Sequence, residues 1–174
     1  MSAIAAIVAG SLRDVPDFPS PGILFKDIGP LIADPVAFAA VIEHWRARHT
    51  GRLEVIVGID ARGFIFGAAL AHALGTGFVP VRKAGKLPGP TIERSYDLEY
   101  GSATLAIQVG AISAGQRAFV VDDVLATGGT AEAACRLVEE VGAEVAGIGI
   151  VLELAGLGGR PRLAEWDLET LATA

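Results

Sequence analysis

The chain has 174 residues, which suits one domain with a sizeable hydrophobic core. Hydrophobic residues make up 52% of it and the net charge is −6, so a basic surface that tracks a nucleic-acid backbone is not expected. The single cysteine, Cys135, excludes an internal disulfide, and we expect no membrane segment or signal peptide and a cytoplasmic location, because no apolar run is long enough and residues 1–10 lack positive charge.

Hydrophobic periodicity predicts helices that alternate with strands. From the N-terminus we expect a helix near residues 2–13, a turn-rich link at 17–22, a short apolar run at 23–25, a helix from Pro35 to about Arg48, a buried strand at 55–59 and a helix from about Phe64 to Leu74. The rest is predicted as a strand at 78–81, an irregular segment from Arg82 to about Gly101, strands at 103–107 and 118–121, a helix at 130–141 and a last strand at 145–152.

This alternation predicts an α/β fold with a parallel sheet, in which ligands bind at the carboxyl ends of the strands. Several charged residues directly follow predicted strands, as expected for a site at that edge: Asp60, Arg62, Arg82, Asp122 and Asp123. Cys135 falls on the apolar side of its predicted helix and is interpreted as a core residue.

Residues 118–130, AFVVDDVLATGGT, carry the strongest functional signal. An apolar strand leads into two adjacent carboxylates and then into a glycine-containing turn at residues 126–130, here called the phosphate loop, before a helix begins. Backbone amides at a helix N-terminus bind phosphate. The carboxylates are placed to accept hydrogen bonds from ribose hydroxyls or to approach a metal. The order of residues in this segment matches neither a P-loop nor the dinucleotide-binding fingerprint. A buried strand followed by a polar turn is the structural alternative, but two adjacent carboxylates repel each other without a ligand or partner.

The signature closely resembles that of the type I phosphoribosyltransferases, which use 5-phosphoribosyl diphosphate (PRPP). Further motifs resemble the adenine branch of this family and extend the match to about Arg162: FPSPGILFKDI at 18–28, RGF at 62–64, RKAGKLPGPT at 82–91 and LEYG at 98–101. Two positions depart from the usual pattern, since many relatives have Ser at Ala61 and Arg at Lys26.

The resemblance implies a single type I phosphoribosyltransferase domain over 1–174: a central twisted parallel sheet flanked by helices, an N-terminal hood at about 1–30 and a flexible lid at about 84–101. It implies that adenine and PRPP react to give AMP and diphosphate with Mg²⁺ as cofactor, in a homodimer without nucleic-acid or membrane partners. The metal would be held mainly by PRPP and water near Asp122 and Asp123. A cis peptide bond at Asp60–Ala61 also occurs in the family.

The resemblance also assigns residues to roles. Arg62, Glu99 and Tyr100 are the catalytic candidates, with Glu99 as the general acid or base. The PRPP and AMP contacts are assigned to Asp122, Asp123, Ala126, Thr127, Gly128, Gly129, Thr130, Arg82, Lys83 and Lys86. The adenine contacts are assigned to Leu24, Phe25, Lys26 and Leu154. In a dimer, the cationic stretch at 82–86 would complete the diphosphate pocket of the neighbouring subunit.

Two residues bear on the choice of base. The family members that use hypoxanthine or guanine typically have Asp at the place of Ala126, and Leu154, rather than a lysine, follows Glu153. Neither residue can donate a proton to a 6-oxo group, so adenine is favoured. Two alternatives remain open: a non-catalytic PRPP-sensing regulator of the same fold, and a receiver-like phosphoacceptor domain.

Overall fold

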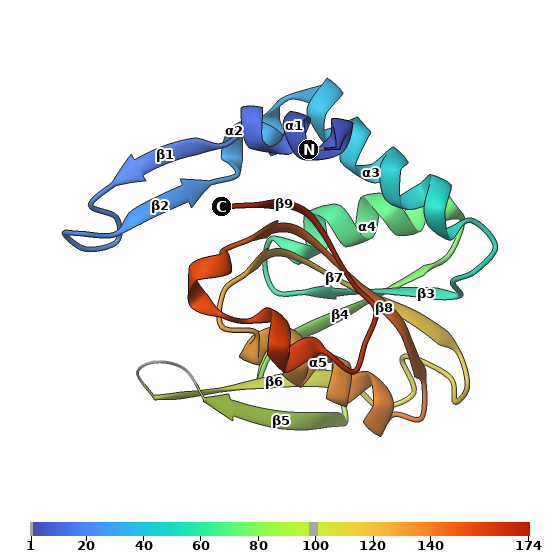
Figure 1. Cartoon of the computed structure of the whole chain (residues 1–174). Coiled ribbons are helices and arrows are strands. Elements are labelled where there is room, and N and C mark those ends of the chain that lie inside the picture. The colour runs from blue at the N-terminus through green and yellow to red at the C-terminus, as the bar shows by residue number, and fades with distance from the viewer. Residues whose placement is uncertain (1, 98–100) are drawn as a thin grey trace.

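A computed structural model describes the chain except residues 1 and 98–100 (Figure 1). Its helices are α1 (Ala3–Gly10), α2 (Gly29–Ala33), α3 (Pro35–His49), α4 (Gly63–Leu74) and α5 (Gly129–Glu140), with short 3₁₀ helices η1 (Ala155–Leu157) and η2 (Arg160–Leu163). Its strands are β1 (Arg13–Pro16), β2 (Leu24–Asp27), β3 (Val55–Ile59), β4 (Gly77–Lys83), β5 (Thr91–Asp97), β6 (Ser102–Gln108), β7 (Arg117–Leu125), β8 (Glu144–Glu153) and β9 (Leu168–Thr173).

Seven of these strands form one sheet in the order β5-β6-β4-β3-β7-β8-β9, and β1 and β2 form a separate hairpin. The strands from β4 to β9 along this order run parallel, as predicted. At the other edge β6 is antiparallel to β4 and to β5, so the sheet is mixed and the prediction of an entirely parallel sheet was wrong there. The link between β5 and β6 is too short for a crossover helix, and a short link joins antiparallel neighbours.

Two strands of the sheet were missed, and outside the sheet the prediction lacked β1 and α2. The segment predicted as irregular between Arg82 and Gly101 contains β5, whose alternate residues Ile92 and Tyr96 pack against the core while polar residues lie between them. The strand at 145–152 is not the last, because β9 follows it and pairs with β8. Both strands lie at the edges of the sheet, where one apolar face is enough and the continuous apolar run of a central strand is absent.

Helices cover both faces of the sheet, with α3 and α4 on one side and α5 on the other (Figure 1). Alternate residues of one apolar strand serve the two layers: Val55 and Val57 pack in the cluster that contains α5, whereas Ile56 packs with α3 and α4. Burial on both faces explains why β3 reads as an unbroken apolar run. In the described part of the chain, no helix combines the length and apolar character needed to cross a bilayer.

Cys135 is fully buried in α5, which confirms it as a core residue. Burial raises the pKa of the thiol, so the reactive thiolate is scarce at neutral pH. We therefore expect the native protein to resist a disulfide-exchange reagent and the unfolded protein to react with one equivalent at once. Absorbance of the released thiolate, with and without denaturant, measures this, and rapid labelling of the native protein would contradict it.

Candidate active site

The phosphate loop lies between β7 and α5, at the carboxyl edge of the parallel strands, as predicted. Gly128 precedes the helix with φ +84°, a left-handed conformation that glycine adopts without strain. A hollow of about 80 Å³ is lined by Asp122, Val124, Leu125, Ala126, Thr127, Gly128, Thr130 and Ala131. The first amides of a helix lack partners within the helix, so the start of α5 offers donors to an anion in this hollow.

The acid pair lies within β7, which continues past the predicted end at 121 to Leu125. Asp122 and Asp123 are 9% and 6% exposed, and the backbone N–H of Asp123 donates to Asp122 Oδ1 at 2.9 Å. Burial, followed by the charge of Asp123, raises the pKa of the Asp122 carboxyl. Two buried carboxylates at the edge of an anion site form an acceptor-rich surface for hydroxyl groups.

Arg62 reaches the acid pair from the turn before α4. Its Nε lies 2.7 Å from Asp123 Oδ2, an ion pair without hydrogen-bond alignment, since this buried oxygen has no hydrogen-bond partner. The turn lies directly against β7, because a Cβ at Gly63 would be 2.6 Å from the carbonyl oxygen of Val121. The peptide bond between Asp60 and Ala61 is cis, which the sequence had left open.

The predicted cationic stretch is divided by the structure. Arg82 Nε pairs with Asp60 Oδ2 at 3.1 Å, and Arg82 Nη1 donates to the backbone oxygen of Lys86 at 3.2 Å. The side chains of Lys83 and Lys86 are exposed. Asp60 therefore offsets part of the repulsion expected among the three cations, and Arg82 stays next to the turn that carries Arg62.

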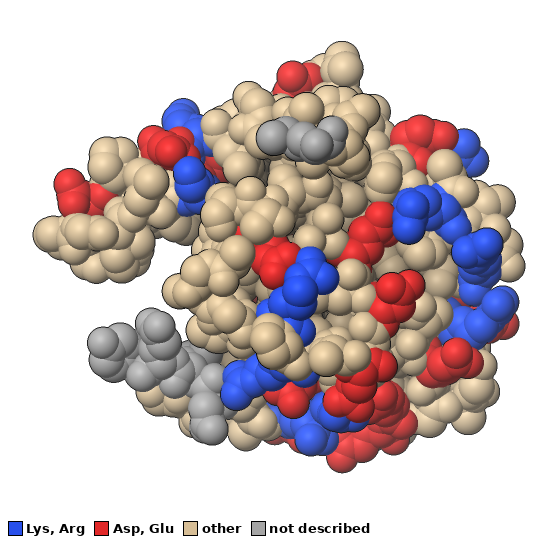
Figure 2. All heavy atoms as spheres, viewed as in Figure 1, with Lys and Arg blue, Asp and Glu red and all other residues tan. Residues whose placement is uncertain are grey.

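The hairpin of β1 and β2 carries the predicted base contacts. Val15 is opposite Phe25 in the register, so Phe25 and Asp27 lie on one face of the hairpin and Leu24 and Lys26 on the other. The ring of Phe18 meets that of Phe25 edge-on at 5.1 Å, beside a hollow of about 290 Å³. Figure 2 shows the surface hollowed beneath this hairpin, which projects from the body of the molecule.

Asp27 was not among the predicted site residues. The hydrogen bond from Gly29 N, followed by that from Arg13, lowers the pKa of the Asp27 carboxyl, and the charge of Arg62 adds to the effect. Asp27 and Arg62 are thus near enough for their charges to interact. The resemblance motif at 18–28 contained Asp27, but nothing in the sequence indicated this interaction.

Leu154 follows β8, and its backbone N–H donates to the carbonyl oxygen of Leu125 at 2.9 Å. The predicted base wall is therefore joined to the start of the phosphate loop. Lys26 Nζ pairs with Asp14 at 2.7 Å, so its side chain is engaged within the hairpin. Glu99 and Tyr100 lie outside the described residues, so their assigned roles stay predictions.

The match to known proteins agrees with this geometry. The model of the phosphoribosyl transferase domain matches residues 30–171. The adenine phosphoribosyltransferase of Kineococcus radiotolerans is 55% identical over 98% of this chain and 92% of its own. The chain belongs to the adenine phosphoribosyltransferase family. The solved adenine phosphoribosyltransferase of Thermoanaerobacter pseudethanolicus has a TM-score of 0.92 at 45% identity and covers 98% of this chain and 99% of its own. That of Saccharomyces cerevisiae, solved with adenine and an imino-altritol bisphosphate, has a TM-score of 0.91 at 43% identity over 98% and 99% of the two chains.

Membership of the adenine phosphoribosyltransferase family confirms the predicted fold apart from the antiparallel edge.

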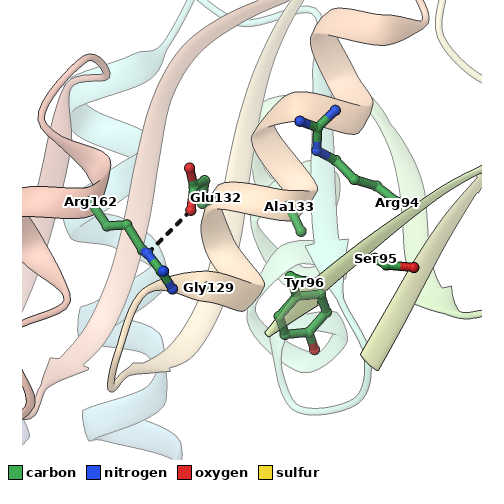
Figure 3. A pocket seen from close by; sticks show the side chains of 7 residues that line it. All are labelled: Arg94, Ser95, Tyr96, Gly129, Glu132, Ala133 and Arg162. Atoms are coloured by element: carbon green, nitrogen blue, oxygen red, sulfur yellow. Dashed lines mark ion pairs between the residues drawn. The ribbon is translucent and has the colours of Figure 1, made fainter. Parts of the chain in front are cut away.

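A polar pocket of about 170 Å³ lies next to the phosphate loop, between β5 and the first turn of α5 (Figure 3). Figure 3 shows Arg162 paired with Glu132 on one side of it and Tyr96 of β5 on the other, while the guanidinium of Arg94 turns toward α5, where its Nη1 lies 3.6 Å from Glu140 Oε2. No role was predicted for Arg94 and Tyr96, because their segment was expected to be irregular.

No role was predicted for the segment after Leu154 either, although it carries an unusual cluster, Gly158-Gly159-Arg160-Pro161-Arg162. Paired glycines after a strand indicate a close approach of two backbones. The structure places Gly159 against the phosphate loop.

Proposed function

We propose that this chain transfers the 5-phosphoribosyl group of PRPP to adenine, giving AMP and diphosphate. The observation that supports this most strongly is the buried acid pair that leads, within one strand, to the phosphate loop at the start of α5. Relatives named adenine phosphoribosyltransferase match nearly the whole chain at about 55% identity. A yeast relative bound adenine together with a bisphosphate, which agrees with a site for a base beside a site for phosphates.

The phosphate loop would hold the 5′-phosphate, and Asp122 and Asp123 would accept hydrogen bonds from the ribose hydroxyls. As the bond from C1′ to the diphosphate oxygen lengthens, negative charge grows on the leaving group and positive charge on the ribose ring. Arg62 and Arg82 lie at the same edge and would stabilise the leaving diphosphate. Binding of PRPP would release Arg62 from Asp123, so that the arginine exchanges one anion for another.

Mg²⁺ fits this site as a partner of the substrate. Asp122 and Asp123 supply carboxylate oxygens, the ligands that Mg²⁺ prefers, and Asp123 Oδ2 is buried without a hydrogen bond. Within the described residues, no cluster of three acidic, histidine or cysteine side chains forms a metal site. The phosphates of PRPP and water would therefore complete the coordination, and the bound ion would supply charge stabilisation for the diphosphate.

On the base side, Phe25 would stack on adenine, Leu24 and Lys26 would offer backbone groups, and Leu154 would form an apolar wall. Glu99 is proposed as the general acid or base at the purine, with Tyr100 beside it. N9 of adenine then attacks C1′ from the side opposite the departing diphosphate. A cytoplasmic location and a homodimer complete the proposal.

In a homodimer, Lys83 and Lys86 are the cations best placed to reach a neighbouring site, because Arg82 is held by Asp60 of its own chain. Mixing the Lys83→Ala/Lys86→Ala double variant with Asp123→Asn tests this. If the sites are shared, activity should return in one of the two sites of each heterodimer. Heterodimers that form, as seen by native mass spectrometry, but stay inactive would show that each site is self-contained.

The decisive experiment incubates the purified chain with labelled adenine, PRPP and Mg²⁺ and follows AMP by chromatography. Formation of AMP and diphosphate in equal amounts supports the proposal. Binding of PRPP without any AMP would instead identify a regulator that keeps the sugar-phosphate site. Omitting Mg²⁺ should abolish turnover, and restored turnover on its return checks the cofactor.

A further inference from the structure

The segment from Leu154 to Leu163 lies directly against the phosphate loop, with backbone atoms of the two in close approach. A Cβ at Gly159 would lie 2.3 Å from the carbonyl oxygen of Ala126 and 2.9 Å from the amide nitrogen of Gly128. A Cβ at Gly128 would in turn lie 2.7 Å from the carbonyl oxygen of Gly159. The two backbones leave no room for a side chain at either glycine.

An ion pair between half-exposed Arg160 and the buried carboxylate of Glu153 holds the residue that follows Gly159. Glu153 is 7% exposed, and both of its carboxylate oxygens receive Arg160 Nε, at 3.0 and 3.1 Å. Thr170 Oγ1 accepts from Arg160 Nη2 at 2.7 Å and donates to Glu153 at 3.0 Å, so the sheet strand β9 holds the pair as well. Arg160 directly follows Gly159 in the chain, so holding the Arg160 side chain also restrains the backbone of Gly159 against the phosphate loop.

A second ion pair joins the segment to α5. Arg162 Nε lies 3.3 Å from Glu132 in the first turn of α5, one turn after the phosphate loop (Figure 3). Arg160 and Arg162 thus fix the segment to β8 and to α5 directly after Gly159. Leu154, at its start, is tied to Leu125 at the start of the loop.

We propose that Gly159 is a positioning residue for the 5′-phosphate, held against the phosphate loop by the pair of Arg160 with Glu153. This inference rests on the proposed function. Amides that bind a phosphate act well only if they are aligned before the ligand arrives, because a small displacement lengthens several hydrogen bonds at once. The segment that forms the base wall thereby also sets the distance between the base and the phosphate.

Gly159→Ala and Gly156→Ala are a matched pair of variants. Both change a glycine of the same segment to alanine, but a Cβ at Gly156 meets no atom within 4 Å and the residue has no left-handed φ. Gly159→Ala should weaken binding of ribose 5-phosphate about 10- to 100-fold and raise the KM for PRPP similarly, whereas kcat and the affinity for adenine change little. Gly156→Ala should match the wild type. Calorimetric titration with ribose 5-phosphate and with adenine gives the two affinities.

A second series keeps the test informative if Gly159→Ala folds poorly. Arg160→Gln should raise the KM for PRPP, and Arg160→Lys should recover part of the loss because it keeps a cation on buried Glu153. Arg46→Ala, which removes an exposed pair with Glu43 on α3, is the control and should have no effect.

The outcomes separate this inference from the proposed function. A Gly159→Ala protein that binds ribose 5-phosphate as tightly as the wild type overturns the positioning role, as does equal weakening for ribose 5-phosphate and adenine. Wild-type protein that binds ribose 5-phosphate but forms no AMP overturns the proposed function alone.

Discussion

Adenine should be used at least about 1,000-fold more efficiently than hypoxanthine or guanine, since sites built around hydrogen-bond matching reject the wrong edge by large factors. The side chains of Ala126 and Leu154 have no group that can donate to a 6-oxo oxygen. Glu153, the ionisable residue next to Leu154, is occupied by Arg160 and Thr170. A bound 6-oxo purine would therefore bury an acceptor without a partner. Steady-state kcat/KM for the three purines at saturating PRPP measures the preference.

Leu154→Ala provides the control for this prediction. It should lower kcat/KM for every purine by a similar factor, because it removes an apolar contact that does not distinguish their edges. Turnover of hypoxanthine within about tenfold of adenine would contradict the assignment of the adenine branch.

Asparagine at Asp123 should lower kcat/KM for PRPP by roughly 10- to 150-fold, which corresponds to the loss of about 1.5–3 kcal/mol from hydrogen bonds to a charged acceptor. The melting temperature should change little, because Arg62 is half-exposed and its ion pair with Asp123 is partly screened by water. Initial rates at varied PRPP and thermal unfolding give the two quantities. Unchanged kinetics with a large loss of stability would show that the acid pair serves the fold.

Asp122→Asn, in contrast, should stabilise the folded protein at neutral pH. The pKa of Asp122 is raised in the folded state, so its charged form destabilises the fold above the unfolded pKa, near 3.9, and the penalty is absent below it. The variant should therefore melt above the wild type at neutral pH, and the difference should vanish as pH falls toward about 4. Asparagine keeps the Oδ1 acceptor for the N–H of Asp123. A variant that melts below the wild type at neutral pH would contradict this reading.

The sequence indicated the centre of the fold well and its edges poorly. β3 and β7 are buried on both faces, so their apolar runs were recognisable. β5 contributes only Ile92 and Tyr96 to the core, and its polar residues resemble those of a loop. β9 has the same half-buried character, and the antiparallel edge could not be predicted once β5 was missed.

In the site, the sequence located residues that share one short segment, such as the acid pair and the phosphate loop. It could not locate contacts between distant segments. The pairing of Arg62 with Asp123 and the close approach of Gly159 to Ala126 each join residues that are far apart in the chain. Such contacts depend on how strands are ordered in the sheet, and that order is not encoded in local periodicity.

The strand order also has a consequence for the folding of the chain during its synthesis on the ribosome. β3 pairs on one side with β4, which follows it closely, and on the other with β7, where Val55 is opposite Ala118. A nascent chain that has been synthesised through β6 thus holds β3 with one open edge and no strand to cover it. Unpaired edges invite association with other chains, and non-local pairing slows folding. β7, the strand that carries the acid pair, covers this edge of β3 and in turn presents its own edge to β8, so a half-made chain is both inactive and prone to aggregate until the C-terminal strands emerge.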